Sequence, residues 1–232
     1  MNDLIGVDGC IDGWICLHET QSSLSAKVVS SFAQLIQSVP TDAIIAIDVP
    51  IGLPEKGART CDLESRRFLK PPRASSVFPA PVRAALAGGT YENVCKIHYD
   101  TDGRRISKQA FCILDKIREV DDVMAAKPSL QSFVREIHPE VSFALWNNER
   151  AMQYRKSRSA GRAERESLIN AAWPRERERL NLELRSFRFK PDDLNDAFAA
   201  LWTARRIHSG TFRVFPMQPP RDRMCLRMEI VA

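Results

Sequence analysis

The stretch LIGVDG, residues 4–9, places the carboxylate of Asp8 at the end of an apolar, β-branched run. The same pattern recurs in AIIAIDVP, residues 43–50, where Asp48 closes an uninterrupted apolar run. Runs of this kind predict buried strands, and the second predicts a central strand covered on both faces. A third motif, DDLNDAFAALWTA at residues 192–204, places Asp193 and Asp196 three positions apart at the start of an apolar helix. We expect these acids to meet where the strands end.

Each acid also has an ordinary structural interpretation. Asp8 precedes Gly9, and Asp-Gly pairs are common in turns. Asp48 could cap a loop or pair with an arginine, since a buried carboxylate needs a partner. Asp192 or Asp193 could cap the helix. Asp196 lies one turn further in, before small residues that would let the helix lie close to the sheet: Ala197, Ala199 and Ala200.

Together the acids predict a divalent metal site. Carboxylates are costly to cluster without a positive partner, and Mg²⁺ or Mn²⁺ is the usual partner of an all-oxygen ligand set. Such a site suits two-metal hydrolysis of a phosphodiester, in which one ion activates water and the other stabilises the departing oxygen. In this hypothesis Asp8 bridges both ions, and Asp48 and Asp196 or Asp193 complete their shells.

Size and composition favour one folded domain rather than a disordered or membrane-spanning chain. The 232 residues (26.3 kDa) are 44% hydrophobic, which is enough for a core. No apolar run reaches the ~18 residues of a membrane span, and the N-terminus has no signal-peptide pattern. The six cysteines form no C-x-x-C pair, so we interpret them as reduced thiols and expect a cytoplasmic protein.

The hydrophobic pattern predicts three strands, a helix and a fourth strand in the first 48 residues. The strands are LIGVD, WICLHE, SLSAKVVS and AIIAIDV, and the helix is SFAQLIQSV, capped by Ser30 or Ser31. A loop-rich region follows Asp48, in which CDLESRRFL could form a short helix. We then expect one helix over 108–126, a strand SFVREIHP ending at Pro139, a last helix stopping at Gly210, and a final strand in MCLRMEIV.

Residues 150–190 are strongly basic. They hold twelve Arg or Lys and five Glu, a surplus of seven that exceeds the net charge of +5 of the whole chain. Arginine forks suit phosphate oxygens, so a polyanionic partner fits this segment. A solvated helix face fits equally well, because glutamates interleave with the arginines. A dimer surface is a further possibility for the same segment. We expect helices here, broken at Pro174.

The order of these elements resembles the ribonuclease H-like superfamily. DAFAALWTA is similar to the closing helix of its Holliday-junction resolvase branch. More closely, the chain is similar to a bacterial and archaeal family catalogued as a domain of unknown function and described as predicted RNase H-like nucleases. The matching pieces span residues 5 to 231: GVDGCIDGW, AIDVPIGLP, RTCDLESRRFL, SSVFPAP, KQAFCILDKIREVDD, EIHPEVSF, DDLNDAFAALWTA and LRMEIV.

The resemblance implies roles for particular residues. Asp8, Asp48 and Asp196 would hold the metals, with Asp193 as the fourth acid and Glu140 as a reserve ligand. Arg59 and Arg66 would clamp a phosphate, or pair with Asp62 or Glu64 instead. His138 would protonate a leaving group or orient water, or be structural. Lys156, Arg162 and Arg165 would follow a nucleic-acid backbone. The helix SFAQLIQSV lacks the catalytic glutamate of the ribonuclease H enzymes, so their RNA–DNA hybrid substrate is not implied.

The sequence therefore predicts an α/β fold: a ribonuclease H-like core with a mixed five-stranded sheet flanked by helices. It predicts one domain over residues 1–232, with loop-rich and basic helical insertions at about 50–107 and 145–190. The predicted function is a metal-dependent nuclease using Mg²⁺ or Mn²⁺. The alternatives are a non-catalytic nucleic-acid-binding or regulatory module on the same fold, and an actin-like ATP-using phosphotransferase. DNA, RNA and a small phosphorylated substrate are not distinguished, and a homodimer stays open.

Overall fold

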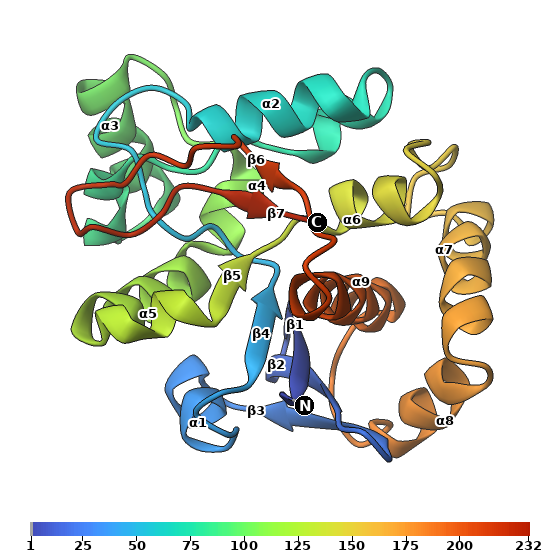
Figure 1. The fold of residues 1–232 in the computed structure, drawn as a ribbon. Coiled ribbons are helices and arrows are strands. Elements are labelled where there is room, and N and C mark those ends of the chain that lie inside the picture. The colour runs from blue at the N-terminus through green and yellow to red at the C-terminus, as the bar shows by residue number, and fades with distance from the viewer. Residues whose placement is uncertain (1) are drawn as a thin grey trace.

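A mixed five-stranded sheet organises the molecule, seen here in a computed structural model that describes residues 2–232 (Figure 1). The strand order is β3-β2-β1-β4-β5. Strands β1, β2 and β3 are antiparallel neighbours, whereas β4 and β5 run parallel to β1. The strands are β1 (Leu4–Cys10), β2 (Gly13–Glu19), β3 (Leu24–Val29), β4 (Ile44–Ile47) and β5 (Val134–Glu136).

Helices cover both faces of this sheet. One face carries α1 (Phe32–Gln37) and α5 (Leu114–Ala126). The other carries α9 (Pro191–His208), with α7 (Ser159–Ala172) and α8 (Glu176–Glu183) packed outside it (Figure 1). The remaining α-helices and strands are α2 (Thr60–Leu69), α3 (Tyr91–Asp102), α4 (Lys108–Cys112), α6 (Pro139–Trp146), β6 (Val214–Phe215) and β7 (Ile230–Val231).

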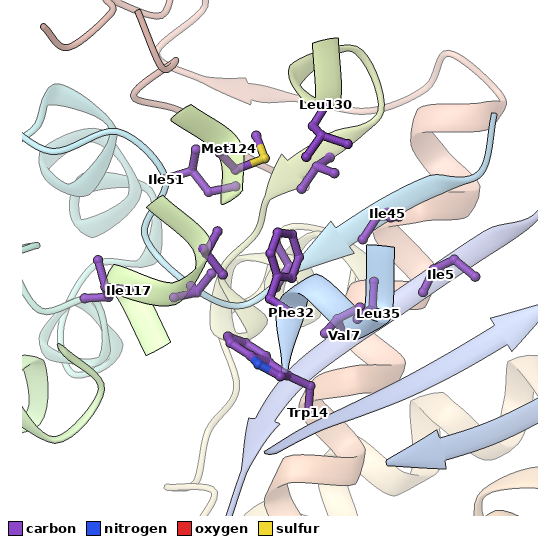
Figure 2. Packing of buried hydrophobic residues seen from close by; sticks show 14 of the residues in the cluster. Ile5, Val7, Trp14, Phe32, Leu35, Ile45, Ile51, Ile117, Met124 and Leu130 are labelled. Atoms are coloured by element: carbon purple, nitrogen blue, oxygen red, sulfur yellow. The ribbon is translucent and has the colours of Figure 1, made fainter. Parts of the chain in front are cut away.

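Alternation along β1 divides its side chains between two cores. Ile5 and Val7 point toward α1 and α5, into a cluster with Trp14 and Phe32 (Figure 2). Leu4 lies in the opposite cluster, beneath α9. Asp8 follows Val7 and therefore belongs to the α9 face, because successive side chains of a strand point to opposite faces. The strand pattern thus aims this carboxylate at the closing helix.

Gly6 lets α9 lie directly on β1. A Cβ atom on Gly6 would come within 2.3 Å of the Leu201 backbone nitrogen and 2.4 Å of the Ala197 carbonyl oxygen. Ala197, Ala200 and Ala204 are fully buried in the same contact. Small residues on both elements therefore bring the first turn of α9 close to the carboxyl end of β1, as the small residues of the helix predicted.

The first four predicted strands, the short helix and the closing helix are all present. Ser31 is the N-cap of α1, and its side chain accepts a hydrogen bond from the Gln34 backbone N–H. The basic region is helical and broken around Pro174, between α7 and α8. Among residues 2–232, no helix combines the length and apolarity needed to cross a bilayer.

Several predicted elements are wrong in extent. The helix expected over 108–126 is two helices, α4 and α5, interrupted at Ile113, whose backbone is not helical. The predicted strand SFVREIHP is only the three residues of β5, because His138 already caps helix α6. The final strand is only Ile230–Val231, paired with Val214–Phe215. The region expected to be loop-rich contains α3, which Thr90 caps and Gly103 terminates.

Candidate active site

Asp8, Asp48 and Asp196 meet at the carboxyl end of the parallel strands. Asp8 comes from β1, Asp48 directly follows β4, and Asp196 comes from the second turn of α9. The Asp48 backbone N–H donates to the Val7 carbonyl oxygen at 3.0 Å, which holds the two strand ends side by side. Asp8 and Asp196 are buried, and Asp48 is half-buried. Three motifs separated by up to 188 positions in the sequence therefore form one acidic cluster.

Burial and mutual repulsion make this cluster electrostatically costly. Burial, followed by the charges of Asp48 and Asp196, raises the pKa of Asp8 well above its usual value. Burial and the charge of Asp196 do the same to the pKa of Asp48. Burial also raises the pKa of Asp196, although Lys156 opposes this shift. Carboxylates that raise one another's pKa in this way are stabilised by a nearby positive charge or by uptake of a proton.

Lys156 supplies one positive charge to the cluster. Its ammonium forms a salt bridge with Asp196 Oδ2 and lies 3.7 Å from Asp192 Oδ2. Burial lowers the pKa of this ammonium, but the charges of Asp196, Asp8 and Asp48 outweigh burial and raise it above its ordinary value. The sequence pointed to Lys156 as a contact for a nucleic-acid backbone, whereas here it contacts the carboxylates.

Two buried carboxylate oxygens have no partner. Asp196 Oδ1 and Glu140 Oε2 lack any hydrogen-bond donor within residues 2–232. Asp196 is 1% exposed, so water does not readily compensate this oxygen. An unpaired buried charged oxygen costs free energy and indicates a missing positive or donor group.

These residues fit a hard divalent cation in donor type and charge. All the donors are carboxylate oxygens, and the single lysine leaves the three acids with unbalanced negative charge. Among residues 2–232, however, no three His, Cys, Asp or Glu side chains are already grouped tightly enough to hold a metal ion. The Lys156 ammonium is bound to the cluster instead.

Arg59 fixes the loop that follows Asp48. Its guanidinium binds both oxygens of Glu136, each at 2.7 Å, and Asp62 Oδ1 at 2.6 Å. It also donates to the carbonyl oxygen of Ile51, and Glu136 Oε2 accepts from the Ile51 backbone N–H at 2.6 Å. Arg59 is 3% exposed and saturated by these partners, so it positions the loop rather than contacting a phosphate.

Glu136 was not singled out from the sequence. Burial, partly offset by Arg59, raises its pKa to about 7. Its position offered a signal, because Glu136 is the last residue of β5, just as Asp48 directly follows β4. Its pairing with Arg59 was not visible, since 76 residues separate the two in the chain.

His138 lies beside the cluster as a neutral helix cap. Its Nδ1 accepts from the Glu140 backbone N–H at 3.2 Å, so the proton resides on Nε2, which donates to the Ser76 carbonyl oxygen at 3.3 Å. Burial and the Lys156 charge lower its pKa to about 4. At neutral pH this imidazole therefore has no second proton to give to a leaving group, contrary to one expected role.

Arg165 is a buried structural residue. It is completely inaccessible to solvent and forms a salt bridge with Glu140 Oε1. It also donates to the carbonyl oxygens of Gly161 and Tyr154. Arg165 therefore has no surface with which to follow a nucleic-acid backbone, and Glu140 keeps only its second oxygen free.

The other predicted residues, Asp193, Arg66 and Arg162, each form a hydrogen bond with a backbone group. Asp193 accepts a hydrogen bond from the Lys190 backbone N–H at 2.8 Å, so Lys190 rather than an aspartate holds the cap position. Burial raises the pKa of Asp193 to about 6. Arg66 and Arg162 are half-buried, and each donates to a backbone carbonyl, of Val77 and Ser157 respectively.

Comparisons with known proteins give one match. A family model described as "Protein of unknown function (DUF429)" matches residues 6–221, nearly the whole chain. No curated protein and no solved structure matches this chain.

Proposed function

The chain belongs to the DUF429 family, and we propose that it is a divalent-metal-dependent nuclease that hydrolyses phosphodiester bonds on a ribonuclease H-like core. The observation that carries this proposal is the convergence of Asp8, Asp48 and Asp196 from three distant motifs. No ordinary structural role requires two buried acids and a half-buried third to lie together with one buried oxygen unpaired.

The arrangement of elements supports the proposed core. Three antiparallel strands are followed by a helix and a fourth strand parallel to the first. The closing helix α9 then returns across β1 and delivers Asp196 to the strand ends. This is the order of acid-bearing elements on which the resemblance to ribonuclease H-like enzymes rests.

In this proposal the acids hold the cation, and the neighbouring residues hold the acids in place. Asp8, Asp48 and Asp196 would hold Mg²⁺ or Mn²⁺. Glu140 Oε2 is a further buried carboxylate oxygen without a partner within residues 2–232 and would be the reserve ligand. When bound, the cation would supply Lewis-acid stabilisation of the negative charge that develops on the phosphate. Arg59 and Glu136 hold the Asp48 loop in place. His138 keeps the start of α6 and the Ser76 segment together.

Exposed cations on the segment that carries Lys156 support a polyanionic substrate. Arg155 and Arg158 are exposed on the segment that carries Lys156, and Tyr154 beside them is 45% exposed. Exposed arginines favour phosphate oxygens, and an exposed aromatic ring offers a stacking surface for a base. These features suit DNA or RNA alike.

A cleavage assay tests the proposal. Labelled single-stranded and double-stranded DNA, RNA and a four-way junction are incubated with protein and Mn²⁺ or Mg²⁺, and EDTA stops the reaction. We expect Asp8→Asn to lower the cleavage rate by about a hundredfold or more, the scale on which loss of one charge-stabilising group acts. Asp12→Asn is the matched control, since Asp12 lies four residues on and binds Arg188 instead. Equal cleavage by Asp8→Asn and wild type would refute the proposal.

A non-catalytic nucleic-acid-binding module is the second candidate. The salt bridge between Lys156 and Asp196 favours it, because the cluster already contains a cation of its own. This candidate predicts nucleic-acid binding that weakens steeply with salt, without metal-dependent turnover. Sedimentation with and without the nucleic acid would also measure whether the protein is a homodimer.

A further inference from the structure

Lys156 approaches the acidic cluster from the solvent side. Its side chain is 41% exposed, whereas the Asp196 side chain it binds is 2% exposed. The pair therefore joins a buried acid to a lysine whose stem reaches the surface.

The backbone that carries Lys156 is anchored on both sides. The backbone N–H groups of Gln153 and Tyr154 donate to Glu164 at 2.7 and 3.2 Å. The Tyr154 carbonyl oxygen accepts from Arg165 at 3.3 Å, and the Arg158 backbone N–H donates to the Arg155 carbonyl oxygen at 3.0 Å. A change at Lys156 can therefore be a rotation of its side chain alone.

The ammonium leaves part of the cluster without a partner. It binds Asp196 Oδ2, while Asp196 Oδ1 remains buried and unpaired within residues 2–232. One monovalent charge faces three acids, Asp8, Asp48 and Asp196, whose charges all act on it. A divalent cation would balance more of this charge, but it would have to displace the ammonium from Asp196.

We propose that Lys156 is a built-in counter-ion of the acidic cluster, which holds the carboxylates together without metal and competes with the divalent cation for Asp196. Metal binding then requires the lysine side chain to rotate outward. This inference rests on the proposed function, because it assumes that the cluster binds a divalent cation. It assigns Lys156 a role on the carboxylates that is distinct from contact with a nucleic-acid backbone.

Calorimetric titration of Mn²⁺ into metal-free protein at pH 8 tests the competition. We expect Lys156→Met to bind Mn²⁺ about tenfold or more tightly than wild type, because the repulsion between the two cations is removed. Lys156→Arg keeps the charge and should stay close to wild type. Arg155→Met removes a neighbouring exposed charge that does not contact the acids, and should change the affinity by less than about threefold.

Thermal unfolding of the same proteins gives a second measurement. Without metal, Lys156→Met should unfold at a lower temperature than wild type, because the acids lose their counter-ion. Saturating Mn²⁺ should raise its unfolding temperature more than that of wild type. Binding by wild type, with equal or weaker binding by Lys156→Met, would overturn this inference alone. Absence of Mn²⁺ binding in both proteins would overturn it together with the metal-dependent function.

Discussion

At the scale of single residues, the acidic cluster lowers the stability of the folded chain. Asp8, Asp48 and Asp196 are held where burial and repulsion oppose their ionisation. Carboxylates in such positions destabilise the folded chain when no cation is bound. Their placement therefore supports the proposal that this cluster binds a cation.

Replacement of Asp8 tests this view. We expect Asp8→Asn to raise the melting temperature of the metal-free protein at pH 8, because an uncharged amide replaces a buried, repelled carboxylate. Each ~1 kcal/mol relieved corresponds to about 2–4 °C in a chain of this length. Differential scanning fluorimetry in EDTA measures the shift. Asp12→Asn, in the turn after β1, should give little change, because the Arg188 side chain that binds Asp12 is exposed. A large loss of stability in Asp8→Asn would contradict the prediction.

The effect of Asp8→Asn should also depend on pH. The pKa of an unfolded aspartate is about 3.9, and the pKa of Asp8 is raised in the folded protein. Between these two values the folded state binds more protons, so the free energy of unfolding falls as the pH rises. The difference in the free energy of unfolding between Asp8→Asn and wild type should therefore be smallest near pH 4 and increase as the pH rises. Urea unfolding at several pH values measures it, and a difference that shrinks with pH would oppose this account.

At the scale of elements, the contact between β1 and α9 decides whether the site forms. Gly6 has no space for a Cβ atom against the backbone of α9. The same contact aligns Asp8 on the strand with Asp196 on the helix. The element that stabilises the sheet thus also assembles the site.

A methyl group on Gly6 should separate the two elements. We expect Gly6→Ala to lower the free energy of unfolding by about 2 kcal/mol or more, because the clash is with backbone atoms rather than a movable side chain. Gly9→Ala is the control, since its Cβ would meet only the flexible Lys116 side chain. Urea unfolding compares the two. If Gly6→Ala proved as stable as Gly9→Ala, the close contact would not be essential.

At the scale of the whole molecule, buried ion pairs join distant segments. The Arg83 guanidinium binds Asp121 of α5 at 2.7 and 2.9 Å and also contacts Asp222 near the C-terminus. Asp222 in turn accepts from the Leu53 backbone N–H at 2.9 Å. Arg83 thereby ties the region after Asp48 to α5 and to the C-terminal segment.

Removal of this arginine should affect the entire fold. We expect Arg83→Met to lower the free energy of unfolding by about 3–5 kcal/mol, because Asp121 and Asp222 would remain buried without their partner. Lys96→Met breaks an exposed pair with Asp100 and should cost less than about 1 kcal/mol. Denaturant titration distinguishes the two outcomes. Equal stability of both variants would show that Arg83 is not essential to the fold.

The sequence by itself determined the main strands, the closing helix and the three acids at their ends. These follow from local patterns: apolar runs ending on a carboxylate, small residues on one helix face, and caps such as Ser31. It also indicated where the basic helices break. These features depend on neighbouring residues and are therefore visible in a linear chain.

Only the tertiary structure decided the partners of the charged residues. Arg59 and Glu136 pair across 76 intervening residues, Arg165 turns inward to Glu140, and Lys156 binds Asp196. The sequence around a charged residue does not distinguish a side chain that faces water from one that binds a buried partner. Burial and distance in three dimensions decide which of the two applies. A charge removed from water needs an opposite charge nearby, and the fold determines which residue supplies it.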